Sequence, residues 1–203
     1  PWLMPRRRRQ ILANTPAHIV QRGNDKKPCF LAHKDRRCYL AALGEVSDQY
    51  QVDVHAYVLM TNHVHLLVTP KSNDGVSRMI QQLGRKYVSF FNESHERTGT
   101  LWEGRFRSST VASTRYFYAC HRYIEMNPVR AQMVASADRY EWSSYRTNAF
   151  GHPSKLVRPS DLYMRLGDSK EERLTAYKRL FDRESPDMDD EIRQAYRKGR
   201  TLE

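Results

Sequence analysis

The chain has 203 residues, 39% of them hydrophobic, which is enough for one cored domain with appendages. Its 34 Lys and Arg residues exceed its 23 Asp and Glu residues, a net charge of +11. Residues 151–203 hold 12 basic and 11 acidic side chains, which leaves 22 basic and 12 acidic ones in residues 1–150. Such an excess favours a polyanionic partner, because each neutralised phosphate releases condensed counterions. No apolar run approaches the roughly 20 residues of a membrane span, and the three cysteines form no CxxC pair. We therefore expect a cytoplasmic protein with no membrane partner.

The first third of the chain alternates between strand and helix patterns. Residues 17–22 form a short apolar run that ends at a Gly-Asn turn signal, which predicts a strand. Apolar residues at helical spacing predict a helix over residues 33–49. Residues 51–59 and 63–69 both show strand patterns. Their connection is too short for anything except an antiparallel hairpin.

The pattern continues with two helices and one more strand. Residues 75–96 carry apolar side chains on one helical face, and residues 102–112 alternate as a strand. A third helix is expected from a Ser113 or Thr114 cap to Met126, where an Asn-Pro pair stops it. This order of elements predicts an α+β fold of the ferredoxin-like split βαβ type. We expect an antiparallel sheet with helices on one face.

Charge and composition divide the chain into three parts. Residues 1–13 contain four consecutive arginines and are expected to form a basic N-terminal arm. Residues 14–150 hold the predicted sheet domain. Residues 151–203 are highly charged and are expected to form a C-terminal helical extension appended to that domain. Its helices are expected at residues 159–166, 169–183 and 187–199.

The sequence His63-Val64-His65 places two imidazoles in one predicted strand. Side chains two apart in a strand share a face, with backbones roughly 6–7 Å apart, so both rings can converge on one divalent ion. Val64 points the other way, into the core. A pair of solvated histidines, or of histidines that find partners in the core, is the alternative interpretation of this motif.

The third predicted helix carries a second group of polar residues. Tyr123 and Asn127 are four apart and share a helical face. A tyrosine oxygen beside a metal could attack a phosphodiester, and the amide of Asn127 could supply an oxygen ligand that suits Mg²⁺ or Mn²⁺. Alternatively, Tyr123 only packs and Asn127 only caps the helix.

Other tyrosines and histidines compete for these roles. Tyr116 lies on the same face as Tyr123 but about 10 Å away along the axis, and Tyr118 faces elsewhere, so both are weaker candidate nucleophiles. We expect His55 and His121 to pack or to form hydrogen bonds. His18 stays undecided, because a neighbouring strand could bring it to the site.

Three segments carry a resemblance to a known family. They are Thr-Asn-His-Val-His-Leu-Leu-Val at 61–68, Leu-Trp-Glu-Gly-Arg-Phe at 101–106, and Arg-Tyr-Ile-Glu-Met-Asn-Pro-Val-Arg-Ala at 122–131. In this order they resemble the single-tyrosine HUH transposases of IS200/IS605 type, and more narrowly the REP-associated tyrosine transposases. The resemblance covers roughly residues 14–147. It implies the HUH nuclease fold, in agreement with the fold expected from periodicity.

The resemblance also implies roles for the matching residues. His63 and His65 would be metal ligands, and Tyr123 would form a 5′-phosphotyrosine while freeing a 3′-hydroxyl. Asn127, where better-known relatives carry glutamine, would be the third ligand with a side chain shorter by one methylene. The implied substrate is single-stranded DNA that folds into a REP-like palindromic hairpin, and the REP-associated branch implies a monomer.

Several residues are candidates for holding DNA. Four consecutive arginines without an apolar partner are typical of an arm that lies along phosphates, although a solvated tail fits them equally. The aromatic and basic residues after residue 101 suit base stacking beside phosphates, and Phe106 could equally belong to the core. The candidates are Arg6, Arg7, Arg8, Arg9, Arg105, Phe106, Arg107, Arg122 and Arg130.

These observations favour a metal-dependent single-strand DNA endonuclease and strand-transferase, located in the bacterial cytoplasm with the nucleoid. The alternative is a non-catalytic ferredoxin-like module that recognises hairpin DNA with vestigial histidines. A relaxase or replication initiator fits less well, because such enzymes usually order the tyrosine and histidine elements differently or carry a third histidine. A zinc hydrolase fits less well still, because no third ligand follows at zinc spacing.

Overall fold

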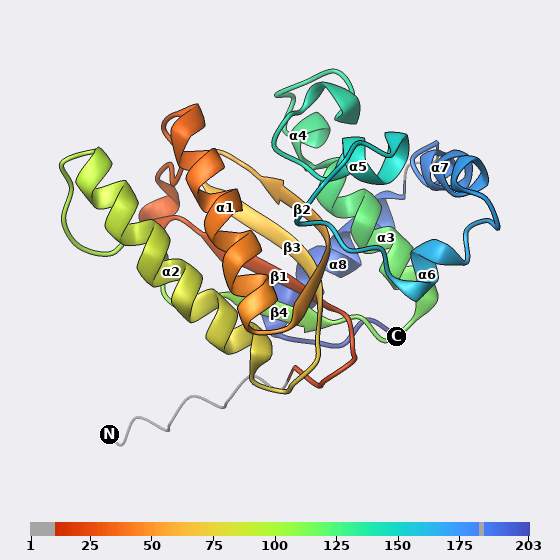
Figure 1. Cartoon of the computed structure of the whole chain (residues 1–203), viewed down its shortest axis with the longest axis horizontal. Helices are drawn as coiled ribbons and strands as arrows, with labels where there is room; N and C mark the ends of the chain where they lie inside the picture. Colours follow the sequence, from red (N-terminus) through yellow and green to blue (C-terminus); the bar gives the residue numbers. More distant parts are fainter. Residues whose placement is uncertain (1–10, 183–184) are drawn as a thin grey trace.

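The computed structural model describes residues 11–182 and 185–203, and within them four antiparallel strands form a sheet of order β2-β3-β1-β4 (Figure 1). The strands are β1 (Ala17–Arg22), β2 (Val52–Leu59), β3 (His63–Pro70) and β4 (Arg107–Thr110). Three helices lie between or after them: α1 (His33–Gln49), α2 (Gly75–Ser94) and α3 (Thr114–Glu125). The succession β1-α1-β2-β3-α2-β4-α3 confirms the predicted α+β fold.

Strand pairing fixes which residues share a face of the sheet. β3 lies between β1 and β2, with His65 opposite Val20 on one side and Val58 on the other. The register between β2 and β3 shifts between Val54 and Ala56, where His55 is the extra residue of a bulge. His65 therefore lies in the middle of the sheet, between two paired strands.

The expectation of helices on one face of the sheet is wrong. α1 and α2 cover one face, and α3 covers the other together with the C-terminal helix α8 (Pro186–Lys198) (Figure 1). The reason lies in the strands, which bury side chains on both sides: Val64 and Leu66 alternate with His65 and Leu67, and all four are buried. A sheet that is apolar on both faces needs a cover on each.

Two element boundaries differ from those expected, one at β4 and one at the end of α3. Strand β4 spans only Arg107–Thr110, because the chain turns at Gly104 (φ +73°) and Trp102 makes only an isolated bridge to Gly23. Helix α3 stops at Glu125 and is followed at once by a short helix α4 (Asn127–Arg130), which has its proline in the first turn. Proline is tolerated there because the first turn leaves backbone N–H groups unpaired anyway.

The C-terminal segment contributes residues to the core. Three short helices follow α4: α5 (Tyr145–Phe150), α6 (Asp161–Met164) and α7 (Lys170–Arg179). Helix α8 then buries Ile192, Ala195 and Tyr196 against the sheet and α3. After it, Leu202 forms a parallel bridge with Val111, next to β4. Short 3-10 turns occupy Asn24–Lys26 and Ala137–Arg139.

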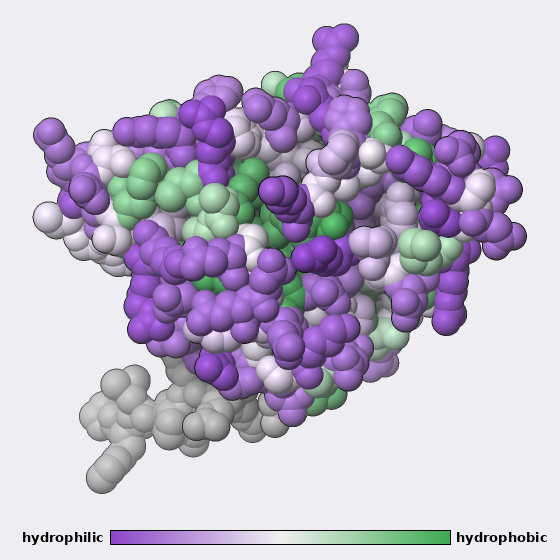
Figure 2. All heavy atoms as spheres, in the orientation of Figure 1, coloured by the Kyte–Doolittle hydropathy of each residue, from purple (hydrophilic) through white to green (hydrophobic). Residues whose placement is uncertain are grey.

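The surface is mainly hydrophilic on the face seen in Figure 2, with smaller apolar patches between the charged side chains. In the described part of the chain, no helix is both long and apolar enough to cross a membrane.

Candidate active site

Four predicted residues converge on the face of the sheet that α3 and α8 cover. His63 and His65 extend from β3, with ring centroids 5.1 Å apart. The ring of Tyr123 on α3 meets His65 edge-on at 5.7 Å. Asn127 at the start of α4 interacts through its side chain with His63. Residues separated by about sixty positions in the sequence therefore form one cluster.

Helix α3 presents Tyr123 to the sheet because of where it begins and which face it buries. The hydroxyl of Ser113 accepts a hydrogen bond from the Tyr116 backbone N–H and caps the first turn. Phe117, Cys120 and Ile124 are buried, and they lie on the side of the helix that includes Tyr123. One turn after Tyr123, the Asn127 amide nitrogen donates to the Tyr123 carbonyl at 3.4 Å.

The two histidines are neutral at physiological pH. Burial, followed by the nearby Arg22 guanidinium, lowers the pKa of His63 to about 4. Burial, followed by the neighbouring His18 and His63 rings, puts the pKa of His65 well below its usual 6.5. Neutral imidazoles are the form that binds metal ions.

The two histidines together with the Asn127 amide could bind a hard divalent cation. No group of three or more His, Cys, Asp or Glu side chains in residues 11–182 and 185–203 is placed to hold a metal. Two neutral imidazoles and the amide oxygen of Asn127 are nevertheless a donor set that Mg²⁺ or Mn²⁺ accepts, with water or substrate phosphate completing the shell. A thiolate metal site is not formed, because the three cysteines lie elsewhere and are unpaired.

A third histidine, left undecided by the sequence, lies in direct contact with this pair. His18 Nε2 is 2.8 Å from His65 Nδ1, and the two rings stack with centroids 5.0 Å apart. His55 and His121, which were expected to pack or to form hydrogen bonds, do form hydrogen bonds. His55 Nδ1 donates to the Arg158 carbonyl at 2.7 Å, and His121 Nδ1 is 2.9 Å from the hydroxyl of Tyr177.

The rival tyrosines both have other partners. Tyr116 hydrogen-bonds to Glu191 on α8, and the Tyr118 hydroxyl donates to the Leu162 carbonyl at 2.8 Å. Their hydroxyls are therefore held by groups other than the histidines. Of the three tyrosines weighed from the sequence, Tyr123 is the one with ring contacts to His18 and His65.

Comparison with known proteins places this site in a family. A family model described as "Transposase IS200 like" matches residues 11–127, more than half of the chain. The chain belongs to the IS200-like transposase family. The matched range contains every member of the cluster: both β3 histidines, His18, Tyr123 and, as its last residue, Asn127.

One solved structure agrees with this assignment at the level of the fold. The transposase resembles "the REP associates tyrosine transposase bound to a REP hairpin" with a TM-score of 0.61 and 18% identity, over 79% of this chain and 93% of that one. A candidate transposase from Deinococcus radiodurans R1 aligns with a TM-score of 0.42 and 18% identity, over 64% of this chain and 92% of that one. A search of curated proteins found no match.

The C-terminal helix of the transposase contributes residues to the site that sequence reasoning missed. Tyr196 interacts with the Tyr123 phenol, and its ring meets the rings of His18 and His65 edge-on at 5.3 and 5.7 Å. The Arg193 side chain also interacts with the Tyr123 phenol. The sequence feature that could have indicated this contact is the spacing of Asp189, Ile192 and Tyr196, which places them on one face of α8, where all three are buried.

These contacts leave Tyr123 only 3% exposed. Burial, together with the adjacent Tyr196, raises the pKa of the Tyr123 phenol well above 10, and the positive charges of Arg130 and Arg193 oppose that rise. The Arg130 guanidinium lies over the Tyr123 ring, 4.4 Å from its centroid. In this arrangement Tyr196 and Arg193 of α8 lie against the phenol.

The predicted DNA contacts fall into four groups. Arg6, Arg7, Arg8 and Arg9 lie outside the described residues. Arg105 and Arg107 are exposed and line a small hollow beside Tyr196, together with Arg22 and Arg197, so they form a basic cluster. Phe106 is largely buried in the core cluster and also lines a hollow together with Gly104 and Arg105.

Arg122 and Arg130, also predicted to bind phosphate, instead hold α8. Arg122 is buried and donates to Asp189 at 2.6 Å, and Arg130 donates to the other carboxylate oxygen at 3.0 Å. One buried carboxylate thus joins α8 to α3 and α4. Each guanidinium uses one terminal nitrogen for this contact.

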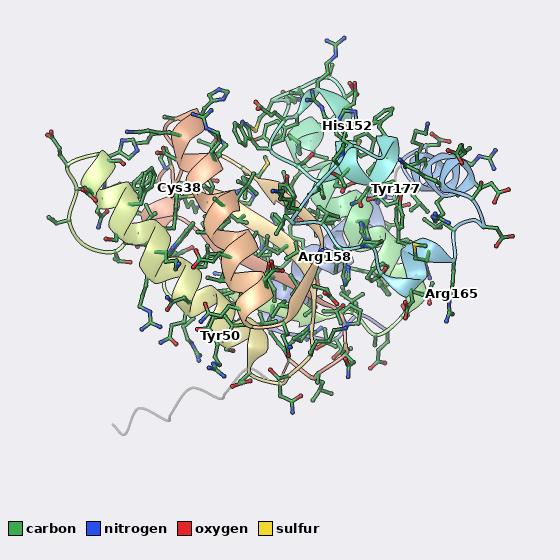
Figure 3. All side chains as sticks on the ribbon, viewed as in Figure 1. Cys38, Tyr50, His152, Arg158, Arg165 and Tyr177 are labelled. Carbon is green, nitrogen blue, oxygen red and sulfur yellow. The ribbon has the colours of Figure 1, made fainter. Side chains whose placement is uncertain are left out.

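A second buried carboxylate lies two residues after Tyr123. Glu125 accepts hydrogen bonds from the Ser144 hydroxyl (2.5 Å), the Asn148 amide (2.9 Å) and the Tyr177 hydroxyl (2.7 Å). Tyr177 lies on the side of α7 that faces α3 and α5 (Figure 3). Burial raises the pKa of Glu125 to about 7, although the hydrogen bonds from these three donors act to lower it. The network ties α3 to α5 and α7.

Proposed function

We propose that this transposase is a metal-dependent endonuclease and strand-transferase for single-stranded DNA, with Tyr123 as its nucleophile. The observation that carries the proposal is the meeting of Tyr123 with His65, ring centroids 5.7 Å apart, beside His63 and Asn127. A tyrosine oxygen can act as a nucleophile, and a bound metal ion can polarise the phosphodiester that it attacks.

The chemistry assigns a role to each residue. The Tyr123 oxygen, after losing its proton, would attack the scissile phosphorus and displace the 3′-oxygen, which leaves a 5′-phosphotyrosine and a free 3′-hydroxyl. Because the phosphodiester energy is kept in the phosphotyrosine, a 3′-hydroxyl can reverse the attack and rejoin DNA without ATP. Arg193 and Arg130 place positive charge beside the phenol, which favours its ionised form.

His63, His65 and Asn127 would hold Mg²⁺ or Mn²⁺. The bound ion would polarise the scissile phosphate and lower the pKa of the phenol. Both imidazoles are neutral, so they need not lose a proton to bind it. The Asn127 side chain already interacts with His63, so the shorter amide lies within reach of the histidine pair.

We further propose that the substrate is a REP-like hairpin with single-stranded DNA at its foot, processed by a monomer. Two observations support this substrate. The transposase shares its fold with a protein solved with a REP hairpin. The basic cluster of Arg22, Arg105, Arg107 and Arg197 lies beside Tyr196, next to the active site, where phosphates of the strand to be cut could be neutralised.

Cleavage of labelled hairpin DNA tests this proposal. Oligonucleotides carrying palindromes from the source genome are incubated with the protein in Mg²⁺, in Mn²⁺ and in a chelator, beside a scrambled strand of equal length. We expect metal-dependent nicking next to the hairpin and no nicking of the scrambled strand. Tight, metal-independent binding to the hairpin without any nicking would instead support the non-catalytic binding module.

A further inference from the structure

The orientation of His63 is fixed by its neighbour in the chain, Asn62. The Asn62 amide nitrogen donates to the Lys26 carbonyl at 2.9 Å, so its amide oxygen is the atom that lies 2.7 Å from His63 Nδ1. A carbonyl only accepts, which excludes the flipped amide. His63 must therefore donate from Nδ1, and the lone pair of its ring is on Nε2.

The turn around Asn62 holds this arrangement in place. The Gly23 N–H donates to the Asn62 carbonyl at 2.8 Å, and the Met60 N–H donates to the His63 carbonyl at 2.9 Å. Gly23 has no space for a side chain, since a Cβ there would lie 2.2 Å from the Lys27 carbonyl oxygen. The backbone on both sides of the amide is thus constrained, and the amide has a defined direction.

His65 has an equivalent partner in His18, through the same ring atom. His65 Nδ1 is 2.8 Å from His18 Nε2, and the near-parallel rings differ by 20°. His18 is fully buried, and burial lowers its pKa to about 3, so it is a neutral ring with one N–H and one acceptor nitrogen. When His65 donates from Nδ1, its own Nε2 carries a free lone pair.

We propose that Asn62 and His18 are positioning residues that hold His63 and His65 in the Nδ1–H form and so direct both Nε2 lone pairs to one divalent cation. This inference rests on the proposed metal site and adds how that site is aligned. Partners that fix the tautomer and ring orientation of ligating histidines raise metal affinity, and their loss typically costs 10–100-fold.

The two partners act differently. Asn62 selects the tautomer of His63 by itself, because its oxygen cannot donate. His18 can donate or accept, and its Nδ1 has no hydrogen-bond partner in the described residues in either case. A cation on His65 Nε2 therefore selects the pair in which His65 donates and His18 accepts. His63 should show one tautomer with and without metal, whereas His65 should become fixed when metal binds.

Paired substitutions separate this role from simple packing. His18→Phe keeps a ring between His65 and Tyr196 but has no acceptor, whereas His18→Gln restores an amide oxygen as acceptor. Asn62→Ala removes the acceptor for His63, and Asn62→Asp keeps one. His121→Phe is the control. Like His18, His121 is a buried histidine with one ring nitrogen that has no hydrogen-bond partner in the described residues, but it lies away from the β3 histidines.

The readouts are the Mn²⁺ dissociation constant, from titration of the DNA-free protein, and the imidazole tautomers from nitrogen-15 spectra. We expect about 10–100-fold weaker Mn²⁺ binding for His18→Phe and Asn62→Ala, and recovery of most of that loss in His18→Gln and Asn62→Asp. His121→Phe should bind Mn²⁺ like the unsubstituted protein. In metal-free protein, the spectra should show His63 with its proton on Nδ1.

Two outcomes would overturn the inference and are distinguishable. Unchanged Mn²⁺ affinity in His18→Phe and Asn62→Ala, or a His63 proton on Nε2, would overturn the positioning role while leaving the metal site intact. Failure of the unsubstituted, folded protein to bind Mn²⁺ at all would overturn the proposed metal site and this inference with it.

Discussion

Tyr196 of α8 lies edge-on against His65 of β3, with ring centroids 5.7 Å apart. The C-terminal helix therefore contacts the same histidine that Tyr123 contacts from α3. Because the two tyrosines also interact directly, we expect α8 to limit access to the Tyr123 oxygen. The accessibility of the nucleophile should depend on how firmly α8 is held.

Tyr196→Ala should expose Tyr123. Aromatic pairs contribute about 0.5–1.5 kcal/mol beyond the area they bury, so loss of this ring should increase the uncovered population by about 2–13-fold. The measurement is the rate of Tyr123 nitration, followed by peptide mass spectrometry. Tyr163→Ala on α6, which has no ring contact with the site, serves as the control. Equal nitration rates in both variants would show that Tyr196 does not cover the nucleophile.

Asp189→Ala should destabilise the fold strongly. The carboxylate is buried and accepts from both Arg122 and Arg130, so its removal leaves buried positive charge without compensation. Breaking such a group typically costs about 3–5 kcal/mol. Urea unfolding gives the free energy of unfolding. Asp190→Ala, which removes an exposed pair with Arg193, should cost no more than about 1 kcal/mol. Similar values for the two variants would contradict this interpretation.

The core of the site could be predicted because it depends on short-range periodicity. The period of two along a strand places His63 and His65 on one face, and the period of a helix places Asn127 one turn after Tyr123. Both relations hold in the structure. The order of strands and helices followed from the same two periods, since each element is continuous in the sequence.

Long-range pairing is where sequence reasoning was incomplete. Arg122 looked like a phosphate contact because its partner, Asp189, lies 67 residues further along the chain. The charge of the C-terminal segment suggested a solvated appendage, although Ile192 and Tyr196 bury one face of α8. Nothing local indicated that this face would cover the second side of the sheet, which also explains why helices were expected on one side.

Buried neutral histidines should make the protein sensitive to acid. Burial lowers the pKa of both His18 and His121 to about 3, against 6.5 for an unfolded chain. Their contribution to stability is complete above pH 6.5 and decreases as the pH falls from 6.5 towards 3, because the unfolded chain then binds more protons. At pH 5 each of these histidines should lower the free energy of unfolding by about 2 kcal/mol relative to its value at neutral pH. Urea unfolding of the native protein and of His121→Phe between pH 7 and pH 5 tests this, and parallel pH profiles would contradict it.

Glu125 should act in the opposite direction. Burial raises its pKa to about 7, above the ordinary 4.5, so the folded state binds more protons between these values. Its contribution is complete below pH 4.5 and is lost as the pH rises through 7. The native protein should therefore lose about 3 kcal/mol relative to Glu125→Gln between pH 4.5 and pH 7. The free energy of unfolding at both pH values measures this difference. A difference that does not change with pH would mean that Glu125 stays ionised when buried.

The covalent step provides the most direct test of the account. Protein and labelled single-stranded hairpin DNA are incubated with Mn²⁺, denatured and digested, and the peptide that carries the nucleotide is identified by mass spectrometry. Tyr116→Phe and Tyr118→Phe, whose hydroxyls contact Glu191 and Leu162, serve as matched controls for Tyr123→Phe. We predict a 5′-phosphotyrosine on Tyr123 that is retained in both controls and absent from Tyr123→Phe. An adduct on another residue, or one that persists in Tyr123→Phe, would contradict the assignment of Tyr123 as the nucleophile.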